Sequence, residues 1–498
     1  MNRQNFFKHL TLALAFVFLA AFAGQVRRAR HARHAPAARL AVQEPHHPDD
    51  AGATDFEPAE DSEVIVRFRD GMTTEEIDAV IARLNDRLED RFEHLDDTVL
   101  IADEDHMDAE RVAEQYRALP GVVYAEPNFS ISLSPGEDED DAAEEADDPG
   151  EDDPPVVKVA GPNDPLFNEQ WSLQNTGQRG GRSGADICAT RAWAKTTGSN
   201  KIVVAVIDTG VDYRHSDLAG NIWTRPAGLA PYADRELGTF DDLHGFDAAD
   251  MDGDPMDDNG HGTHCAGIVG AEGDNKEGVS GVNWHVQIMP LKFLDASGRG
   301  SLRAAIECIN YCIARKKEGV NVRIISASWG SNFGSRALRD AIRRAGEEGI
   351  LFVAAAGNDS TNNDRLPHYP SNYDLPNVLA VAALNRQDGL ARFSNFGARS
   401  VHIAAPGAEI LSTWPNNQYE EHSGTSMATP EVSGVAALVL AANPNMTVEE
   451  LRARLLESVD KIPALEGRVS SGGRLNAARG TMLTQISIYV FDAPPGQF

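Results

Sequence analysis

The chain has 498 residues, of which 45 are basic and 76 acidic, giving a formal net charge of −31 at pH 7. This length is sufficient for one large domain with a substantial core, or for two to four smaller units. The excess of acidic residues argues against a nucleic-acid-binding protein, because phosphates need a basic face that this composition lacks.

The first residues have the pattern of a secretory signal peptide, which we predict over residues 1–23. Arg3 and Lys8 precede an apolar run over residues 10–23 that ends in the sequence AFA. The run has about 14 residues, whereas a helix that spans a membrane needs roughly 20. We therefore expect a secreted or extracytoplasmic protein with no stable membrane anchor after signal removal. An uncleaved anchor is the alternative.

A small α+β domain is predicted over residues 63–134, after a basic and polar spacer over residues 24–62. Strands at VIVRF, TVLIA and GVVYAEP alternate with helices at TTEEIDAVIARL and DAERVAEQYRAL. An acidic linker follows over residues 135–160, where twelve aspartates or glutamates and no basic residue lie between positions 137 and 153. Charge repulsion favours an extended, cleavable connector there over a calcium-binding run.

A long α/β unit is predicted over residues 161–480. Short apolar runs typical of buried parallel strands recur at KIVVAVID, VQIMPLKF, VRIISASW, ILFVAAAG and VLAVAAL. Helical patterns lie between several of them, at SLRAAIECINYCIARKK, SRALRDAIRRAGEEG and ATPEVSGVAALVLAAN. This alternation predicts a mostly parallel central sheet with helices on both faces, and functional residues just beyond the carboxyl ends of the strands. Residues 481–498 form a tail without an assigned role.

Four cysteines occur, Cys188, Cys265, Cys308 and Cys312. The last two lie at i, i+4 spacing in a predicted helix, which holds their Cα atoms near the upper limit for a disulfide. Two buried thiols are therefore favoured over a bridge at this position.

Three polar residues occupy the places where such a sheet presents reacting groups. Asp208 ends VVAVID, His261 begins HGTHCAG, and Ser426 lies in SGTSMATP directly before an apolar helix. A hydroxyl needs a general base to become a nucleophile, and an imidazole base needs an acceptor that fixes its tautomer. Each residue alone has an ordinary interpretation as a helix cap or a structural histidine. In the order Asp, His, Ser, with these small-residue surroundings, the three motifs resemble the subtilisin-like serine proteases over about residues 163–480.

The resemblance implies a serine endopeptidase that forms an acyl-enzyme intermediate, and it assigns further residues. Asn358 in AAAGNDS would form the oxyanion hole together with the backbone N–H of the nucleophile. The segment ISASWGS would pair with an extended peptide substrate. The residues implied in substrate binding are Ser328, Trp329, Gly330, Ala356 and Gly357.

Calcium is the cofactor that the resemblance implies, with no organic cofactor. Hard cations bind several oxygens at once, including main-chain carbonyls. The implied ligands are Asp164, Asp217 and, from one loop, Gly273, Asn275, Glu277 and Val279. A second acidic cluster over residues 246–260 resembles an EF-hand loop, but its glycine is misplaced and the bidentate glutamate is missing. A second calcium ion therefore stays open.

Three alternatives remain beside this interpretation. His261, His264 and Cys265 have a spacing that permits zinc, although partner motifs are absent. Otherwise His264 is expected to face the core, and Cys265 to make the enzyme sensitive to thiol reagents. A lipase or esterase is disfavoured because Ser426 lies in GTSMA rather than in G-x-S-x-G. A catalytically inactive binding protein on the same scaffold is the alternative outside enzymes.

The domain over residues 63–134 resembles the propeptide of these proteases, including VVYAEPN near its end. We expect a segment ending near Asn128 to lie in the active-site groove as an inhibitor and to assist folding. Cleavage between about residues 129 and 164 would release it. The expected partners are thus protein or peptide substrates and the chain's own propeptide, with no nucleic acid. A permanent accessory domain is the alternative.

Overall fold

The computed structural model describes residues 62–133 and 161–482. The predicted signal peptide and acidic linker, and nearly all of the spacer and the C-terminal tail, lie outside the described residues.

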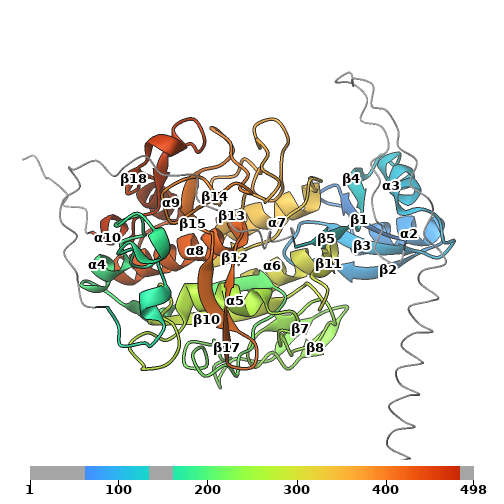
Figure 1. Cartoon of the computed structure of the whole chain (residues 1–498). Coiled ribbons are helices and arrows are strands. Elements are labelled where there is room, and N and C mark those ends of the chain that lie inside the picture. The colour runs from blue at the N-terminus through green and yellow to red at the C-terminus, as the bar shows by residue number, and fades with distance from the viewer. Residues whose placement is uncertain (1–61, 134–160, 483–498) are drawn as a thin grey trace, which may run out of the picture. The chain divides into compact units, whose positions relative to one another are not determined.

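Residues 62–133 form a four-stranded antiparallel sheet with two helices on one face, drawn in blue in Figure 1. The strand order is β2-β3-β1-β4. The elements are β1 (Glu63–Phe68), α2 (Thr74–Arg83), β2 (Asp86–Arg91), β3 (Thr98–Asp103), α3 (Ala109–Arg117) and β4 (Val122–Pro127). Residues alternate between faces, so Val64 and Val66 pack under the helices while Ile65 joins the core shared with the following domain. The three predicted strands and both predicted helices are present.

Strand β2 is the element of this domain that sequence patterns missed. Its sequence is DRLEDR, in which five of six residues are charged. It lies at the edge of the sheet, where charged side chains are tolerated more readily than in a central strand. Tertiary pairing with β3 therefore overrides a composition that disfavours a strand.

The second domain is built on a nine-stranded sheet of order β18-β19-β15-β14-β13-β12-β6-β10-β9. Every pair is parallel except β18–β19. All five predicted strands belong to it. The strands are β6 (Gly198–Asp208), β9 (Phe246–Asp247), β10 (His285–Lys292), β12 (Val322–Ala327), β13 (Leu351–Ala355), β14 (Val378–Leu384), β15 (Ile403–Pro406), β18 (Asp460–Lys461) and β19 (Gly473–Arg474).

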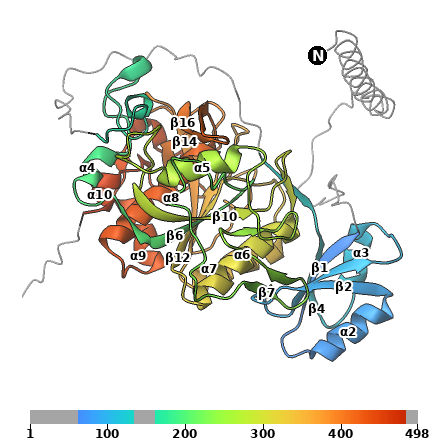
Figure 2. The same cartoon turned by 90° about the horizontal axis from the view of Figure 1, so that it is seen from below.

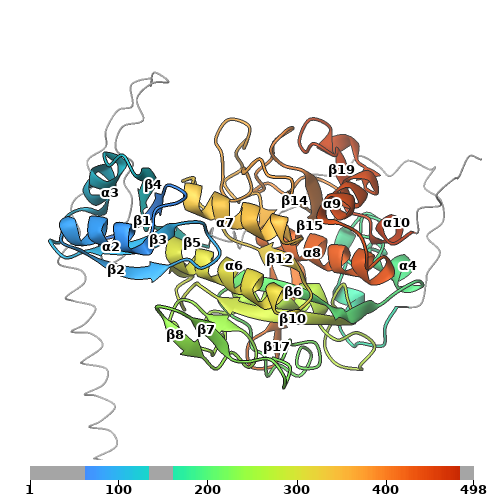
Figure 3. The same cartoon turned by 180° about the vertical axis from the view of Figure 1, so that it is seen from behind.

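Helices cover both faces of this sheet, as predicted. Along β6, Val204 and Val206 face one core, while Val203 and Ile207 face the other. The first core lies under α4 (Ala189–Trp193), α5 (His261–Gly270), α8 (Thr425–Ala442), α9 (Val448–Glu457) and α10 (Ala477–Gly480), and the second under α6 (Leu302–Lys317) and α7 (Arg336–Glu347). Figure 2 shows α5 on the side of the sheet opposite α6 and α7, and Figure 3 shows α6 and α7 side by side.

Shorter elements complete the described chain. They are β5 (Ser130–Ser132), β7 (Tyr232–Asp234), β8 (Gly238–Phe240), β11 (Arg299–Ser301), β16 (Ile410–Trp414), β17 (Gln418–His422) and the 3-10 helices at Phe167–Glu169, Gln178–Gly180 and Pro463–Leu465. All four cysteines are free and buried, as the helical spacing of Cys308 and Cys312 predicts for that pair. Among the described residues, α8 alone is long and apolar enough to cross a membrane, and 89% of it is buried inside the protein.

The topology directs attention to the carboxyl end of β6. This strand lies between β10 and β12. The chain builds β9 and β10 on one side of β6, then crosses over to build β12, β13, β14 and β15 on the other. Ligands of open α/β sheets bind at such a switch point, beyond the carboxyl ends of the strands. Asp208 is the last residue of β6.

Candidate active site

A carboxylate and an imidazole are paired at the switch point. Asp208 Oδ1 lies 2.7 Å from His261 Nδ1, and the Asp208 side chain is fully buried whereas His261 is 17% exposed. Burial by itself lowers the pKa of His261, but the charge of Asp208 and its hydrogen bond outweigh burial and hold that pKa well above its ordinary value. The pair leaves Nε2 as the ring nitrogen that is not bound to Asp208.

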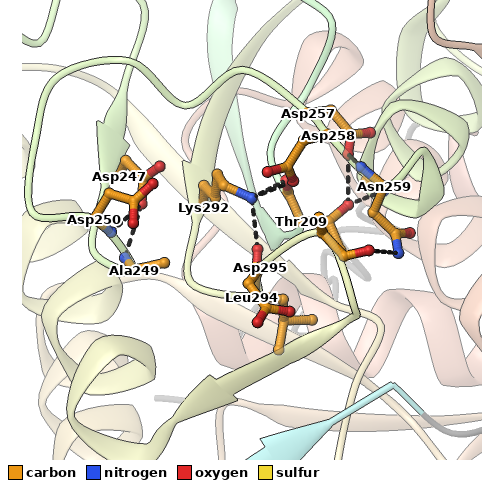
Figure 4. A network of polar contacts seen from close by, with 12 residues as sticks. Thr209, Asp247, Ala249, Asp250, Asp257, Asp258, Asn259, Lys292, Leu294 and Asp295 are labelled. Carbon is orange, nitrogen blue, oxygen red and sulfur yellow. Dashed lines mark hydrogen bonds and ion pairs between the residues drawn. The ribbon is translucent and has the colours of Figure 1, made fainter. Parts of the chain in front are cut away.

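The helix that begins at His261 is held by the acidic loop before it. Asp257 accepts hydrogen bonds from the backbone N–H of Gly260 and Thr263, each 2.9 Å long, and from the Thr209 hydroxyl. Lys292 donates to Asp258 at 2.7 Å and to the Thr209 carbonyl at 3.0 Å (Figure 4). These contacts fix the start of α5 relative to the end of β6.

Protein donors therefore occupy much of the second acidic cluster. Asp257 caps α5, Asp258 pairs with Lys292, and Asp247 accepts the backbone N–H of Ala249 and Asp250 at 2.8 and 3.0 Å. The structure thus gives these carboxylates a role in shaping the loop before His261.

Ser426 lies in the first turn of α8, where the sequence pattern had placed it just before the helix. Its hydroxyl donates to the Ser328 carbonyl at 3.0 Å. Its own carbonyl lacks the usual helical donor because residue 430 is a proline, which has no N–H. The Ser328 hydroxyl, at 2.8 Å, and the Cys265 thiol, at 3.5 Å, donate to that carbonyl instead. Helices α5 and α8 therefore meet at Ser426.

Asn358 is held beside Ser426 in a defined orientation. It follows β13 and is 8% exposed. Its Oδ1 accepts hydrogen bonds from the backbone N–H of Thr425, at 2.9 Å, and from the Thr425 hydroxyl, at 2.8 Å. A Cβ at Gly424 would lie 3.4 Å from Asn358 Nδ2, so the amide nitrogen adjoins the residues before Ser426. Sequence reasoning missed Thr425, whose place in the pattern GTS was its only signal.

The predicted substrate-binding residues differ in what they present. Gly330 forms an antiparallel bridge with Ser132, and a Cβ there would lie 2.2 Å from the His368 ring. A side chain would therefore not fit at this position. The Trp329 side chain is 2% exposed and donates to the Ile207 carbonyl at 2.8 Å. Its side chain thus belongs to the core, which leaves the backbone of Trp329 for the predicted role in substrate binding.

Ala356 and Gly357 continue from β13 toward Asn358. Ala356 is fully buried. Gly357 has φ of +103°, a conformation that favours glycine, and its N–H donates to the Thr425 hydroxyl at 3.2 Å. Both residues therefore lie next to the oxyanion candidates rather than on an exposed rim.

The end of the N-terminal domain lies between two strand segments of the second domain. Strand β5 pairs antiparallel with β11, and Ser132 also bridges Gly330 on its other side. The Leu133 N–H donates to the Gly298 carbonyl at 2.9 Å. The segment in this groove is thus Ser130–Ser132 with Leu133, and the expectation of a segment ending near Asn128 was several residues short. The alternation of Phe129, Ile131 and Leu133 was a usable strand signal.

The predicted calcium ligands are brought together from three segments. Asp164 accepts the backbone N–H of Asp274 at 2.9 Å and of Asn275 at 3.0 Å. Asp217 accepts the Asn275 amide at 2.7 Å and the Val279 N–H at 3.0 Å. Burial raises the pKa of Asp217 to about 7. Gly273 lies in the same loop, and the Glu277 carboxylate accepts the Ser216 hydroxyl. Asn275 presents its NH2 group, not its oxygen, to Asp217.

The zinc set of His261, His264 and Cys265 does not converge. His264 Nε2 contacts the backbone carbonyls of Ile410 and Glu420, at 3.0 and 3.1 Å. Burial lowers the pKa of His264 to about 3, as expected of a core histidine. Cys265 Sγ lies 4.0 Å from His261 Nδ1. The imidazole of His261 is instead paired with Asp208.

Comparison with known proteins gives the family. The model of the subtilase family matches residues 199–478, and that of the fervidolysin N-terminal prodomain matches residues 55–128. The chain is 37% identical to the thermophilic serine proteinase of Bacillus sp. (strain AK1), over 65% of this chain and 72% of that protein. It is 35% identical to thermitase of Thermoactinomyces vulgaris, over 64% of this chain and 97% of that protein.

A solved structure agrees. A protease from Pseudoalteromonas arctica PAMC 21717 is 29% identical, with a TM-score of 0.53, and the match covers 65% of this chain and 99% of that one. The chain therefore belongs to the subtilase family: it is a serine endopeptidase with an N-terminal prodomain. The lipase and inactive-binding-protein alternatives fall with this result, and the N-terminal domain is of the prodomain type.

The paired carboxylate makes a testable electrostatic prediction. In Asp208→Asn the pKa of His261 should fall, because burial then acts without the opposing charge. Histidine NMR titration of the full chain in a Ser426→Ala background measures this shift, with His261→Gln to assign the signal. Asp250→Asn, at an exposed aspartate, is the matched control and should leave the pKa of His261 unchanged. An unchanged His261 pKa in Asp208→Asn would show that Asp208 does not control the charge of this imidazole.

Proposed function

We propose that Asp208, His261 and Ser426 form the catalytic triad of this endopeptidase. The 2.7 Å contact between Asp208 and His261 at the switch point of the sheet is the observation that carries the proposal. Ser426 is the nucleophile, His261 takes its proton through Nε2, and Asp208 orients the ring and stabilises the imidazolium. For that step the Ser426 hydroxyl gives up its hydrogen bond to the Ser328 carbonyl and donates to the imidazole of His261 instead.

Asn358 is proposed as one donor of the oxyanion hole, with the backbone N–H of Ser426 as the other. Two hydrogen bonds from Thr425 occupy its Oδ1 and so orient the NH2 group before substrate arrives. Such preorganised donors act on the negative charge that develops on the carbonyl oxygen.

Peptide substrates are proposed to bind as an added strand between β11 and the segment from Ser328 to Gly330. The chain's own Ser130–Ser132 supplies the pattern, because it pairs on both of its edges in this groove. From the Ser132–Gly330 bridge, the antiparallel register continues toward Ser328, whose carbonyl contacts Ser426. We therefore place the self-cleaved bond within a few residues after Leu133.

The N-terminal domain is proposed to inhibit the enzyme and to assist its folding. Glu126 accepts the backbone N–H of Arg336 and Ala337 at the start of α7, and Asn128 accepts the Arg303 N–H at the start of α6. Both contacts satisfy helix donors that otherwise lack partners.

The proposed parts of the chain are the signal peptide (1–23), spacer (24–62), prodomain (63–134), linker (135–160), catalytic domain (161–480) and tail (481–498). Export to an extracytoplasmic location is proposed from the first of these.

Calcium is proposed as a structural cofactor at Asp164 and Asp217. Among the described residues, the donors that hydrogen-bond to these two carboxylates are backbone N–H groups and the Asn275 amide, all of them uncharged. The charge of Asp164 contributes to raising the pKa of Asp217, after the larger effect of burial. A bound cation would offset that repulsion, and carbonyls of the loop from Gly273 to Val279 would supply further oxygens. Asn275 would have to turn its amide to contribute its oxygen.

Replacing the nucleophile tests the proteolytic mechanism and the processing together. Full-length wild type, produced in an exporting host, should digest an unfolded protein and show a new N-terminus between residues 134 and 163. Ser426→Ala should be inert and keep its prodomain, and mass spectrometry of its N-terminus should begin at residue 24. Ser183→Ala, an exposed serine, should behave as wild type. Self-processing by Ser426→Ala would remove Ser426 from the mechanism.

Truncating the proposed oxyanion donor should affect turnover more than binding. We expect Asn358→Ala to lower kcat by about 10² to 10³ with little change in KM, the magnitude found for this kind of donor in subtilisin. Steady-state kinetics on a peptide substrate measure the change, and thermal melting checks that the variant is folded. A kcat equal to that of wild type would exclude Asn358.

Removal of calcium should destabilise the folded chain. A ligand present at 100 times its Kd stabilises the native state by about 2.7 kcal/mol, so chelation should lower Tm. Differential scanning calorimetry of Ser426→Ala, with and without chelator, measures the effect. Asp217→Asn should reduce the calcium-dependent shift, whereas Asp374→Asn, at an exposed aspartate outside both acidic clusters, should retain it. An unaltered shift in Asp217→Asn would count against this site.

A further inference from the structure

Four carboxylates from three elements gather where the prodomain contacts the catalytic domain. They are Asp90 of β2, Asp234 and Glu236 of the β7–β8 hairpin, and Glu307 of α6. Ligand oxygens of Asp90, Asp234 and Glu236 all lie within 4.8 Å of one another. The contact of the two domains at this point is seen in the Arg235 N–H, which donates to Glu93 at 3.2 Å.

The fold turns Asp90 toward the catalytic domain by a break in the strand. The register of β2 against β3 shifts between Leu88 and Asp90, so Leu88 pairs with Ile101 and Asp90 with Leu100. Ile101 belongs to the core under the prodomain helices, whereas Leu100 belongs to the core shared with α6 and α7. An extra residue in a strand reverses the side on which the following side chains point. Asp90 thus faces the catalytic domain.

Buried oxygens in this cluster have no protein donor. Asp90 is 0% and Glu307 1% exposed. Both oxygens of Asp90, Oε2 of Glu236 and Oε1 of Glu307 are buried and lack a hydrogen-bond partner among the described residues. Asn310, one turn after Glu307 on α6, likewise has both amide atoms buried and unpartnered within that part of the chain. An unsatisfied buried carboxylate is costly, so such a group calls for a partner.

Three arginines lie near this cluster, yet they leave the buried oxygens named above without a hydrogen bond. Arg303 acts electrostatically on Glu307 and Asp234, Arg235 acts on Glu236, and Arg91 lies 3.6 Å from Glu236. The pKa of Glu307 is nevertheless well above its ordinary value, first because of burial and then because of Asp90. Burial and neighbouring acids also raise the pKa of Glu236. The acids of this cluster therefore disfavour one another's charge at the contact.

We propose that Asp90, Asp234 and Glu236 bind a divalent cation of the calcium type, shared between the prodomain and the catalytic domain. Calcium is coordinated by oxygens at about 2.4 Å, so two oxygens on one ion are at most about 4.8 Å apart. The three grouped carboxylates meet that limit without rearrangement. The ion would join two domains whose acidic groups otherwise repel, and its loss would loosen the inhibitory prodomain.

This binding site is separate from the proposed loop site at Asp164 and Asp217, and ion binding does not depend on the triad assignment. The consequence for inhibition does rest on the proposed function. Two independent sets of variants therefore keep the two proposals distinguishable.

The test counts calcium ions on the intact chain. Full-length Ser426→Ala is freed of metal with a chelator, and equilibrium dialysis against calcium chloride measures the ions bound per chain. We expect Asp90→Asn and Glu236→Gln each to bind one ion fewer than this background. Asp70→Asn, an exposed aspartate of the prodomain, should bind the full number. Asp217→Asn removes the loop site alone and shows what the loss of one ion looks like.

Thermal melting adds a second readout, because the effect of Asp90→Asn on the melting temperature should differ between chelator and calcium. In chelator, Asp90→Asn should melt no lower than the background, because it removes a charge from a repelling group. Added calcium should raise the melting temperature of the Ser426→Ala background more than that of the same chain carrying Asp90→Asn. Retention of the full number of ions in either Asp90→Asn or Glu236→Gln would overturn the proposal. A changed pH dependence of melting with an unchanged ion count would also overturn it, since the cluster would then hold a proton.

Discussion

The site depends on one buried contact, the hydrogen bond between Asp208 and His261. Asp208 is fixed because it ends the central strand β6, with β10 and β12 on either side. His261 is fixed because Asp257 holds the first turn of α5, and Lys292 holds Asp258 in the same loop. A charge with so little access to water keeps its effect on the imidazole, because neither solvent nor salt screens it strongly. The sheet, the acidic loop and helix α5 together hold the imidazole of His261 in place.

Around this pair, side chains that border the site supply the hydrogen bonds that regular secondary structure does not provide to the backbone. Pro430 leaves the Ser426 carbonyl without a helical donor, and Ser328 and Cys265 take that place. Thr425 in turn orients Asn358. Preorganisation of this kind lowers the cost of stabilising charge during reaction, because the donors are held in place beforehand. The prodomain uses the same surfaces: it caps α6 and α7 and fills the groove beside β11.

Much of the fold was predictable because its signals are local. The apolar runs of the parallel strands and the amphipathic helices emerged from hydrophobic periodicity, and the order Asp, His, Ser with its flanking small residues identified the family. Strand β2 was missed because five of its six residues are charged, and its pairing with β3 is a tertiary effect. The burial of the Trp329 side chain could not be predicted from the motif ISASWGS, because its packing against Phe293 and its hydrogen bond to the Ile207 carbonyl are tertiary contacts.

The sequence by itself determined the class of fold and the family, and it supplied the residues proposed for the triad, because these inferences depend on residue types and short-range spacing. Only the tertiary structure decided which segment occupies the groove, where Asn358 points, and how Asp90 comes to share a buried cluster with Glu307. Those outcomes depend on strand register and on contacts between residues more than 60 positions apart, such as Thr425 with Asn358 at a separation of 67. A shift of one residue in β2 reverses the face on which Asp90 lies, and no local pattern in the sequence encodes that shift.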